Sequence, residues 1–446
     1  MAESTELEET LEALRGLAHR RFGKIPADVL AKQVVARSAG ADWPVREAAM
    51  EALLRRYRFA QRDELVVAAS PTRGVLGTYK TARRTSGKGK RGERPYTTLL
   101  TSLVPLDGSC DCADFLRSSL GVCKHLLAIL DHVYAKAKGG AVSGTKPPQA
   151  AALRWIPDLP LGGPLDRLSG LRWAIRPGPR PRGWVEAPGG KGLAIERRVL
   201  QDLARRTDVL RTLAAMGRTN AEPAARALVV EELERAQRQI ELHRVAARAA
   251  SHLKSLGRTL YPYQRDGVMG FLQAGRLLLA DDMGLGKTTQ AIAACHALHR
   301  EGSVRKGLLI VPASLKSQWL REWQDTTDVP AAIVEGTPAE RARQYRELRS
   351  GFLILGYEQL LKDFLLVQHL AADIVVLDEA QRIKNWATKS AAYVKALTPR
   401  YRLVLTGTPM ENRLEELASV LDWVDDVALA PKWRLDAWHT TDEGDG

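Results

Sequence analysis

The sequence lacks long hydrophobic runs and is poor in cysteine. No apolar stretch approaches the roughly 18 residues that a membrane-spanning helix requires. There are four cysteines among 446 residues, and three of them cluster, which is not the pattern of a secreted disulfide framework. The first residues, MAESTELEETLEAL, are acidic and amphipathic, unlike a secretory signal peptide. These features favour a cytoplasmic or nucleoid-associated protein that has no membrane partner.

The sequence has fewer acidic residues than basic ones. The chain has 66 Lys and Arg against 52 Asp and Glu, a net charge of +14 and a pI near 9.7. Such an excess favours a polyanionic partner, most simply nucleic acid, although a generic basic surface has the same composition. Residues 80–94, KTARRTSGKGKRGER, are strongly basic. This segment is either a phosphate-binding loop or a solvated one.

Three cysteines and a histidine lie close together in CDCADFLRSSLGVCKH. Cys110 pairs with Cys112 and, ten residues later, Cys123 pairs with His125. Three thiolates and one imidazole form a complete set of tetrahedral zinc ligands. A disulfide suits cysteines one residue apart poorly, and buried, unligated cysteines remain the alternative. The CxC…CxH pattern resembles the SWIM-type zinc finger over residues 50–135, a module implicated in binding DNA or protein.

The stretch LLLADDMGLGKTT, residues 277–289, is typical of a phosphate-binding loop. A short apolar strand leads into a turn with two glycines, Gly284 and Gly286, and then into a run of helix formers. Backbone N–H groups and the helix N-terminus can converge on phosphate oxygens there. Lys287 would reach the β- and γ-phosphates, and the Thr288 hydroxyl would ligate Mg²⁺. Asp281 stands where the strict pattern has its first glycine.

Further apolar runs each end in a polar stretch: 307–323 (GLLIVPASLKSQWLREW), 352–360 (FLILGYEQL), 373–385 (DIVVLDEAQRIKN) and 402–412 (RLVLTGTPMEN). Strands alternating with helices predict a parallel sheet with its site at the strand carboxyl ends. Asp378 can hold Mg²⁺, and Glu379 can orient or deprotonate a water. Gln264, upstream of the loop, can donate and accept, which suits the edge of adenine.

This ordered set of motifs resembles the first ATPase lobe of the Swi/Snf family of DNA translocases, within superfamily-two helicases. The resemblance covers about residues 255–425. In that family the loop reads close to DEMGLGKT, so an acid at the position of Asp281 is normal. Asp282 replaces a usual Glu, and Gln381 stands where many members have His. A zinc finger of this type ahead of the motor resembles certain bacterial members.

The resemblance implies a DNA-dependent ATPase that uses ATP and Mg²⁺ and acts on double-stranded DNA. Lys287, Asp378 and Glu379 would be catalytic, and Thr288 and Asp378 would hold Mg²⁺. The nucleotide would contact Gln264, Asp281, Met283, Gly284, Leu285, Gly286, Lys287, Thr288 and Thr289. Coupling to DNA would involve Pro312, Tyr357, Thr406, Gly407 and Thr408.

The expected fold class is α/β. A RecA-like parallel sheet with flanking helices occupies the C-terminal half. A small α+β zinc-binding domain and a mainly helical connecting region precede it. The predicted divisions are an N-terminal helical region (1–60), the zinc finger domain (61–137), a linker (138–150), the connecting region with long helices (151–256) and the first RecA-like lobe (257–446).

The resemblance also predicts an incomplete motor. These enzymes hold ATP between two RecA-like lobes, and the second lobe supplies an arginine to the transition state. Too few residues follow Thr408 for a second lobe, so we expect weak hydrolysis unless that lobe acts in trans. The alternative is a truncated, non-catalytic zinc-finger protein that binds DNA or protein. The DEAQ and TGTP motifs disfavour a P-loop kinase.

Overall fold

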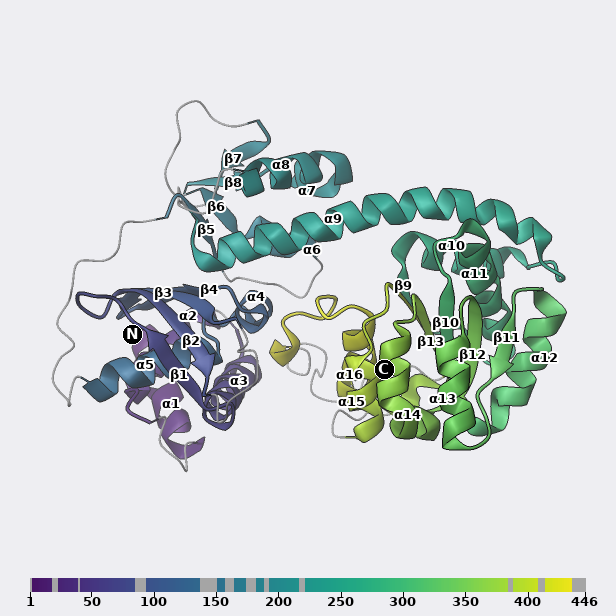
Figure 1. The fold of residues 1–446 in the computed structure, drawn as a ribbon. Coiled ribbons are helices and arrows are strands. Elements are labelled where there is room, and N and C mark those ends of the chain that lie inside the picture. The colour runs from purple at the N-terminus through teal and green to yellow at the C-terminus, as the bar shows by residue number, and fades with distance from the viewer. Residues whose placement is uncertain are drawn as a thin grey trace. The chain divides into compact units, whose positions relative to one another are not determined.

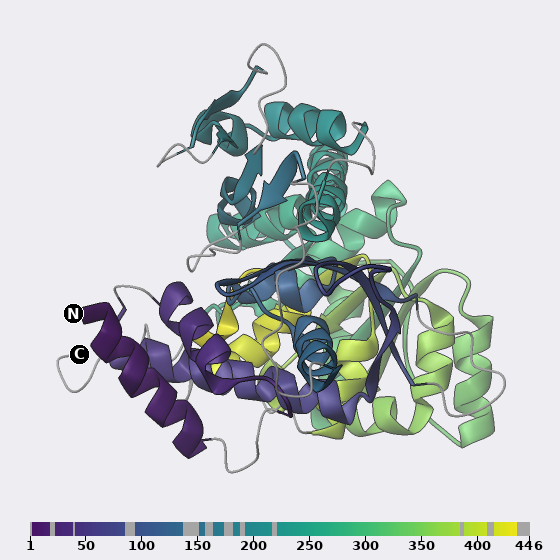
Figure 2. The ribbon, with the colours of Figure 1, turned by 90° about the vertical axis from the view of Figure 1, so that its left-hand side faces the viewer.

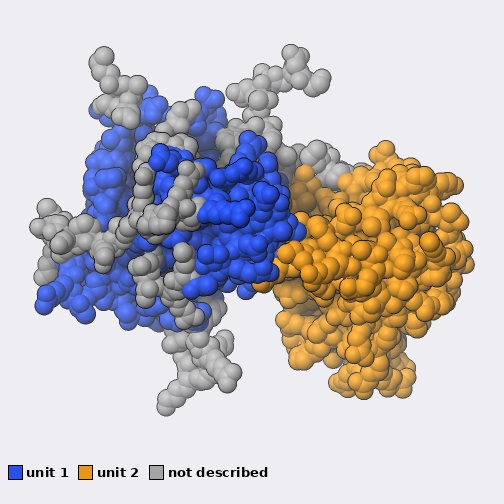
Figure 3. Space-filling view, turned by 90° about the horizontal axis from the view of Figure 1, so that it is seen from above, with its two compact units in different colours: residues 1–236, 429–446 blue, residues 237–428 orange. Residues whose placement is uncertain are grey.

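The chain forms two compact units in the computed structural model. Unit 1 comprises residues 1–236 and 429–446, and unit 2 comprises residues 237–428 (Figure 3). The structure describes residues 2–17, 23–38, 41–84, 94–136, 151–156, 164–173, 182–187, 192–215, 221–383, 388–407 and 414–434. Within these ranges no helix has the length and apolar character needed to cross a membrane.

Unit 1 begins with helices and an antiparallel sheet of order β1-β2-β3-β4. The sheet curves over α5, whose apolar side chains are buried beneath it (Figures 1 and 2). The predicted linker, residues 138–150, lies outside the described residues. The elements are α1 (Ala2–Leu17), α2 (Ala27–Arg37), α3 (Trp43–Arg62), β1 (Leu65–Ala69), β2 (Gly77–Arg83), β3 (Tyr96–Leu103), β4 (Leu106–Cys110), α4 (Ala113–Ser118) and α5 (Lys124–Lys136).

The connecting region contains a second small sheet, of order β5-β6-β8-β7. Its tryptophans Trp155, Trp173 and Trp184 are buried in the core, and the last two meet edge to face with centroids 5.4 Å apart. The sequence pattern does not predict this sheet, because strands of three residues are too short to show alternation. The elements are β5 (Leu153–Trp155), α6 (Pro164–Ser169), β6 (Leu171–Trp173), β7 (Trp184–Glu186), β8 (Leu193–Ile195), α7 (Arg197–Gln201), α8 (Leu203–Ala215), α9 (Pro223–Ala249) and η2 (Ala250–Ser255).

Unit 2 contains a six-stranded parallel sheet of order β11-β12-β10-β13-β14-β9. Its central strands are buried on both faces and are apolar at nearly every position, as parallel strands covered by helices must be. The strands are β9 (Arg276–Leu279), β10 (Lys306–Val311), β11 (Ala331–Ile333), β12 (Gly351–Gly356), β13 (Ile374–Leu377) and β14 (Tyr401–Leu405).

Alternate residues of these strands belong to two separate cores, one on each face of the sheet. Leu309 and Val376 pack with α10, α11 and α12, whereas Leu308 and Val375 pack with α13 to α16 (Figure 1). This arrangement confirms the predicted α/β fold class. The helices are α10 (Pro262–Ala274), α11 (Lys287–Glu301), η3 (Ala313–Leu315), α12 (Lys316–Thr326), α13 (Pro338–Glu347), α14 (Tyr357–Leu370), η4 (Ala380–Ile383), α15 (Lys389–Ala396), α16 (Leu414–Val424) and η5 (Lys432–Arg434, in unit 1).

A buried cation ties the connecting region of unit 1 to α9. Arg167 is 1% exposed and lies 2.7 Å from Glu232 and 3.1 Å from Glu231. Burial raises the pKa of Glu231, but Arg167 and its neighbours outweigh burial and hold that pKa at about 2. Removal of the guanidinium would leave the buried Glu232 carboxylate and the half-buried Glu231 carboxylate without this partner, which is far costlier than removal of an exposed charge.

We expect Arg167→Leu to lower the free energy of unfolding of unit 1 by about 3–5 kcal/mol at pH 7. Hydrogen exchange of unit 1 amides in urea measures this. Arg211→Leu is the control, because the Arg211–Asp208 pair is exposed, and it should cost less than about 0.5 kcal/mol. The pKa of Glu231 is depressed, so this stabilisation is present above pH 4.5 and is lost as the pH falls toward 2. Equal costs for the two variants would contradict this account.

Candidate ATP site and metal centre

The predicted phosphate loop connects β9 to the first turn of α11. Gly284 and Gly286 have φ angles of +85° and +72°, which glycine adopts without strain. A Cβ at Gly286 would lie 2.5 Å from Gln264 Nε2, so a larger residue there would displace the Gln264 amide. Met283 and Leu285 are exposed, at 72% and 39%. The loop therefore presents its backbone and the start of α11 to the surface, as a phosphate-binding loop requires.

Lys287 and Asp281 each brace the loop. The Lys287 ammonium donates to the carbonyl oxygens of Asp281 and Asp282, at 2.7 and 2.9 Å. The Asp281 carboxylate accepts from Gln290 Nε2 at 2.8 Å. An acid in place of the first glycine thus fastens the loop to α11. Sequence reasoning missed Gln290, although an amide in the first turns of α11, with an acid nine residues earlier, was a usable signal.

Gln264 also contacts the loop. Its Oε1 accepts from the Tyr261 N–H at 3.1 Å, and its Nε2 donates to the Leu285 carbonyl at 3.2 Å. The Tyr263 hydroxyl donates to the same carbonyl at 3.2 Å. The Tyr261 and Tyr263 rings stack with centroids 5.9 Å apart, and both are exposed. Contact between Gln264 and adenine stays a prediction. The exposed rings of Tyr261 and Tyr263 lie close to Gln264 in the sequence and could contact the same base.

Asp378, at the end of β13, is held from three directions. Its carboxylate accepts from Trp319 Nε1 at 2.8 Å and from the Glu379 N–H at 2.9 Å. Its carbonyl accepts from the buried Tyr357 hydroxyl at 2.8 Å. Burial raises the pKa of Asp378, and the Trp319 hydrogen bond opposes that rise. The side chain is therefore fixed in orientation, which a metal ligand needs.

Glu379 is connected to the next strand through Gln381. Its backbone has φ +51°, a sparsely populated conformation for a residue with a side chain and one often found at functional sites. The Glu379 carboxylate accepts from Gln381 Nε2 at 2.6 Å, and Gln381 Oε1 accepts from the Thr406 hydroxyl at 3.4 Å. Gln381 thus bridges the motif after β13 and the motif after β14.

The register of the sheet brings several of the predicted residues together. Strands β9, β14 and β13 are parallel neighbours, so their carboxyl ends share one edge. A Cβ at Gly407 would lie 3.0 Å from the Met283 side chain and 3.8 Å from Lys287 Nζ. Thr288 and Thr289 are half-buried in the first turn of α11. Pro312, after β10, and Tyr357 are both buried, and Thr408 lies outside the described residues.

The predicted zinc ligands also converge. The ligand atoms of Cys110, Cys112, Cys123 and His125 all lie within 4.8 Å of one another, and all four residues are buried. Cys110 Sγ and Cys123 Sγ are each 3.9 Å from His125 Nδ1. Tetrahedral zinc–sulfur and zinc–nitrogen bonds of about 2.3 and 2.1 Å place ligand atoms at nearly this separation. No disulfide joins any of the four cysteines.

The surroundings of this Cys₃His cluster act on its sulfurs in both directions: hydrogen bonds favour the negative form of Cys110, whereas burial raises the pKa of Cys112 and Cys123. The Thr98 hydroxyl donates to Cys110 Sγ at 3.2 Å, and the Phe115 N–H donates to Cys112 Sγ at 3.4 Å. Burial raises the pKa of Cys123 to about 11. Burial also acts to raise the pKa of Cys110, but hydrogen bonds from the neighbouring thiols outweigh it and bring that pKa well below its usual value. The chemistry of the donor set fits a divalent cation that displaces the remaining thiol protons.

Trp319→Phe tests whether the Asp378 carboxylate is held ready for Mg²⁺. The variant keeps the buried ring and removes the donor, so we expect Mg²⁺-dependent ATP binding to weaken by about tenfold or more. ATP binding in EDTA should change little. Calorimetric titration with and without Mg²⁺ measures both. The matched control is Trp323→Phe, because Trp323 donates instead to the Val329 carbonyl at 2.7 Å. A similar loss in both variants would contradict this role.

Curated relatives match part of the chain. DNA excision repair protein ERCC-6-like from Bos taurus is 39% identical over 185 residues, 38% of this chain and 15% of that protein. DNA repair and recombination protein RAD54B from Homo sapiens is 32% identical over 37% of this chain and 20% of that protein. Uncharacterized ATP-dependent helicase MG018 from Mycoplasma genitalium is 36% identical over 37% and 17%. The matches thus span 15–20% of the length of these relatives.

A solved structure and a protein family also match. The Sulfolobus solfataricus SWI2/SNF2 ATPase core in complex with dsDNA is 32% identical, with a TM-score of 0.35, over 38% of this chain and 36% of that chain. The model of the SNF2-related domain matches residues 148–442, which include the connecting region as well as the six-stranded sheet. We conclude that this chain belongs to the SNF2-related domain family and carries a helicase-like ATPase domain.

Proposed function

We propose that the chain binds ATP and Mg²⁺ at the edge of the six-stranded sheet and couples ATP hydrolysis to movement on double-stranded DNA. The observation that carries this proposal is the convergence of three motifs at the carboxyl ends of β9, β13 and β14. The phosphate-loop lysine, two carboxylates and a Thr-Gly segment meet there. That combination suits phosphoryl transfer from a nucleotide to water.

Each of these side chains has a role in the proposed reaction. Lys287 would exchange its loop carbonyls for β- and γ-phosphate oxygens, at the positive end of α11. Thr288 and Asp378 would hold Mg²⁺, which supplies charge neutralisation when bound. Glu379 would accept a proton from the attacking water or orient it. Gln264, with Tyr261 and Tyr263 beside it, would hold adenine.

Coupling to DNA would run through Gln381. This side chain contacts both Glu379, beside the proposed water, and Thr406, in the Thr-Gly segment. A change in the γ-phosphate that moves Glu379 would therefore be transmitted to the end of β14. The loops after Pro312 and around Tyr357 are the proposed DNA-facing segments. Since the Tyr357 side chain is buried on Asp378, its own contribution would be to link the site to those loops.

The Cys₃His cluster would bind one zinc ion and stabilise the β1–β4 module as a SWIM-type finger. This module would assist binding of DNA or protein. A second RecA-like lobe, acting in trans, would complete the ATP site with an arginine, and hydrolysis by the chain alone would be weak. The proposed location is the cytoplasm, in association with the nucleoid.

ATP hydrolysis with and without double-stranded DNA tests the motor proposal. We expect low turnover that DNA stimulates, and a loss of at least about 100-fold in Lys287→Ala, because the γ-phosphate loses its main cation. Lys254→Ala is the control, since Lys254 is exposed in η2. ATP binding without turnover would indicate that the second lobe is required. DNA binding without ATP binding would favour the non-catalytic zinc-finger alternative.

Metal analysis of the purified protein tests the zinc proposal. We expect about one zinc per chain, and Cys112→Ser should lose most of it because three ligands hold zinc far less tightly than four. Cys295→Ser is the matched control: Cys295 is also buried, but it lies in α11 and is not one of the clustered ligands. Unchanged metal content in Cys112→Ser would refute the ligand assignment.

A further inference from the structure

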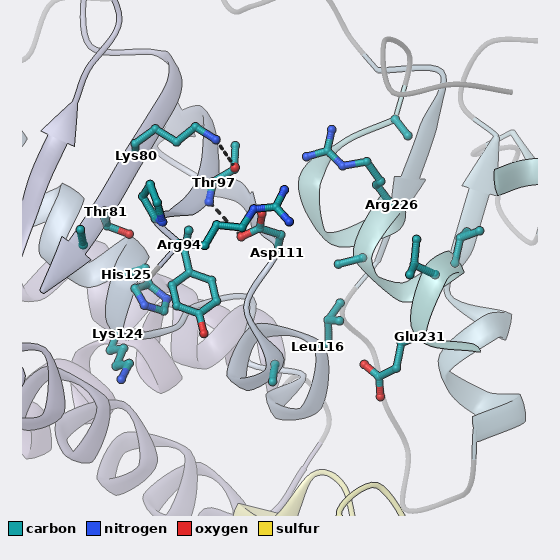
Figure 4. Close-up of a pocket in the computed structure, with 18 of the residues that line it drawn as sticks. Lys80, Thr81, Arg94, Thr97, Asp111, Leu116, Lys124, His125, Arg226 and Glu231 are labelled. Atoms are coloured by element: carbon teal, nitrogen blue, oxygen red, sulfur yellow. Dashed lines mark hydrogen bonds between the residues drawn. The ribbon is translucent and has the colours of Figure 1, made fainter. Parts of the chain in front are cut away.

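Unit 1 contains a cavity of about 1260 Å³ beside the Cys₃His cluster. One wall comes from β2, β3 and the start of α5, and the other comes from α9 (Figure 4). Two contacts join the elements that form the walls. The Ala224 N–H donates to the Ser109 hydroxyl at 2.9 Å, and Arg117 lies 3.2 Å from Glu231. The cavity is therefore part of the packed structure of unit 1, and of the predicted site residues that the structure describes only His125 lines it.

The charged groups that line the cavity leave a surplus of positive charge. Lys80 and Arg94 come from one wall and Arg226 from the other (Figure 4). Lys80 donates to the neutral Thr97 hydroxyl at 2.6 Å. Among the described residues, none of these three cations has an acidic side chain within ion-pair distance. Three cations without counter-ions face one space, and this favours an anionic occupant.

The acids of the lining, by contrast, are mostly engaged. Asp111 accepts from the Thr97 N–H at 2.9 Å, and Glu231 pairs with Arg117 and Arg167. Glu234 is exposed on α9. The lining holds five Lys and Arg side chains against three acids, so its acids cancel only part of the positive charge and a surplus remains.

An aromatic ring lies in the same cavity. Tyr96, at the start of β3, lines it and is 40% exposed. Its ring lies against the imidazole of His125, with centroids 4.3 Å apart and planes at 31°. His125 is 2% exposed and is fixed within the cluster. A ring supported in this way is a suitable platform for stacking a nucleobase.

We propose that this cavity binds a segment of single-stranded nucleic acid, with Lys80, Arg94 and Arg226 on phosphates and Tyr96 stacked on a base. Stacking requires an unpaired base, because the bases of a duplex are already stacked on one another. An acidic peptide would use the cations but not the ring. The inference rests on the role proposed above for the zinc module, whose nucleic-acid ligand it specifies, and it is independent of ATP hydrolysis.

Fluorescence anisotropy of a labelled twelve-residue thymidine oligonucleotide, without ATP, tests the stacking contact. Tyr96→Ala should weaken binding by about 5- to 150-fold, the range for loss of one stacked base. Tyr96→Phe retains the ring and should remain within about twofold of the wild type. Equal losses in both variants, or no loss in either, would overturn the stacking role. A duplex of the same length that binds more tightly and is equally sensitive to Tyr96→Ala would overturn the preference for single strands.

The phosphate contacts are tested by the salt dependence of binding. Each phosphate contact on a single strand contributes about 0.7 to the slope of log affinity against log salt. The double variant Arg94→Ala/Arg226→Ala should therefore reduce the slope by about 1.4. Arg55→Ala/Arg58→Ala, on the exposed face of α3, removes the same charge elsewhere and should leave the slope nearly unchanged. Equal effects of the two double variants would overturn the assignment.

Three further measurements distinguish an acidic peptide from nucleic acid as the ligand, and distinguish failure of this inference from failure of the proposed function. Polyglutamate that competes as well as the oligonucleotide at equal charge would identify an acidic peptide as the ligand and overturn the proposal. The anisotropy series is repeated in the Lys287→Ala background, where binding should persist. Zinc content is measured for every variant. Lost stacking sensitivity with zinc retained would refute only this inference, whereas absence of zinc from the wild type would refute the zinc module.

Discussion

Parallel strands present all their carboxyl ends at one edge of a sheet, and the candidate ATP site depends on this constraint. The order β13-β14-β9 makes neighbours of strands that are far apart in the sequence. Asp378, Thr406 and the phosphate loop are adjacent for that reason alone. The alternation of strand side chains between two separate cores then fixes the register, because a slip of one residue would exchange the two faces. The fixed register of the sheet therefore fixes the relative positions of the site residues.

Around that edge, polar side chains orient the candidate site residues through hydrogen bonds. Trp319 orients Asp378, Gln290 holds Asp281, and Gln381 joins Glu379 to Thr406. Each of these bonds links segments that lie on different elements or at different ends of one loop. The phosphate loop is therefore held by the carboxylate of its own Asp281. Asp378 is held by the indole of Trp319, and Glu379 is held by the amide of Gln381. The resulting network runs from α12 to the end of β14.

The sequence was sufficient to predict what depends on local pattern. Apolar strands ending in polar motifs predicted the parallel α/β fold, and the spacing of Cys110, Cys112, Cys123 and His125 predicted a cluster that the structure brings together. The partner of Trp319 was not predictable, because it depends on how α12 and the end of β13 meet across the sheet, whereas the contact of Gln290 with Asp281 is local and was overlooked. The small β5–β8 sheet was missed since its strands are too short for periodicity. The cavity was missed because Lys80 and Arg226 come to line one space only through the packing of α9.

His125 belongs to two arrangements at once, since it is a candidate metal ligand and the support beneath Tyr96. If metal and strand bind as proposed, this shared ring links their affinities thermodynamically. Whatever factor the metal adds to strand binding, the strand must add to metal binding. If the coupling is positive, nucleic acid in the cavity would raise the chelator concentration needed to remove zinc at equilibrium, and the metal occupancy of the finger would depend on whether a strand is bound.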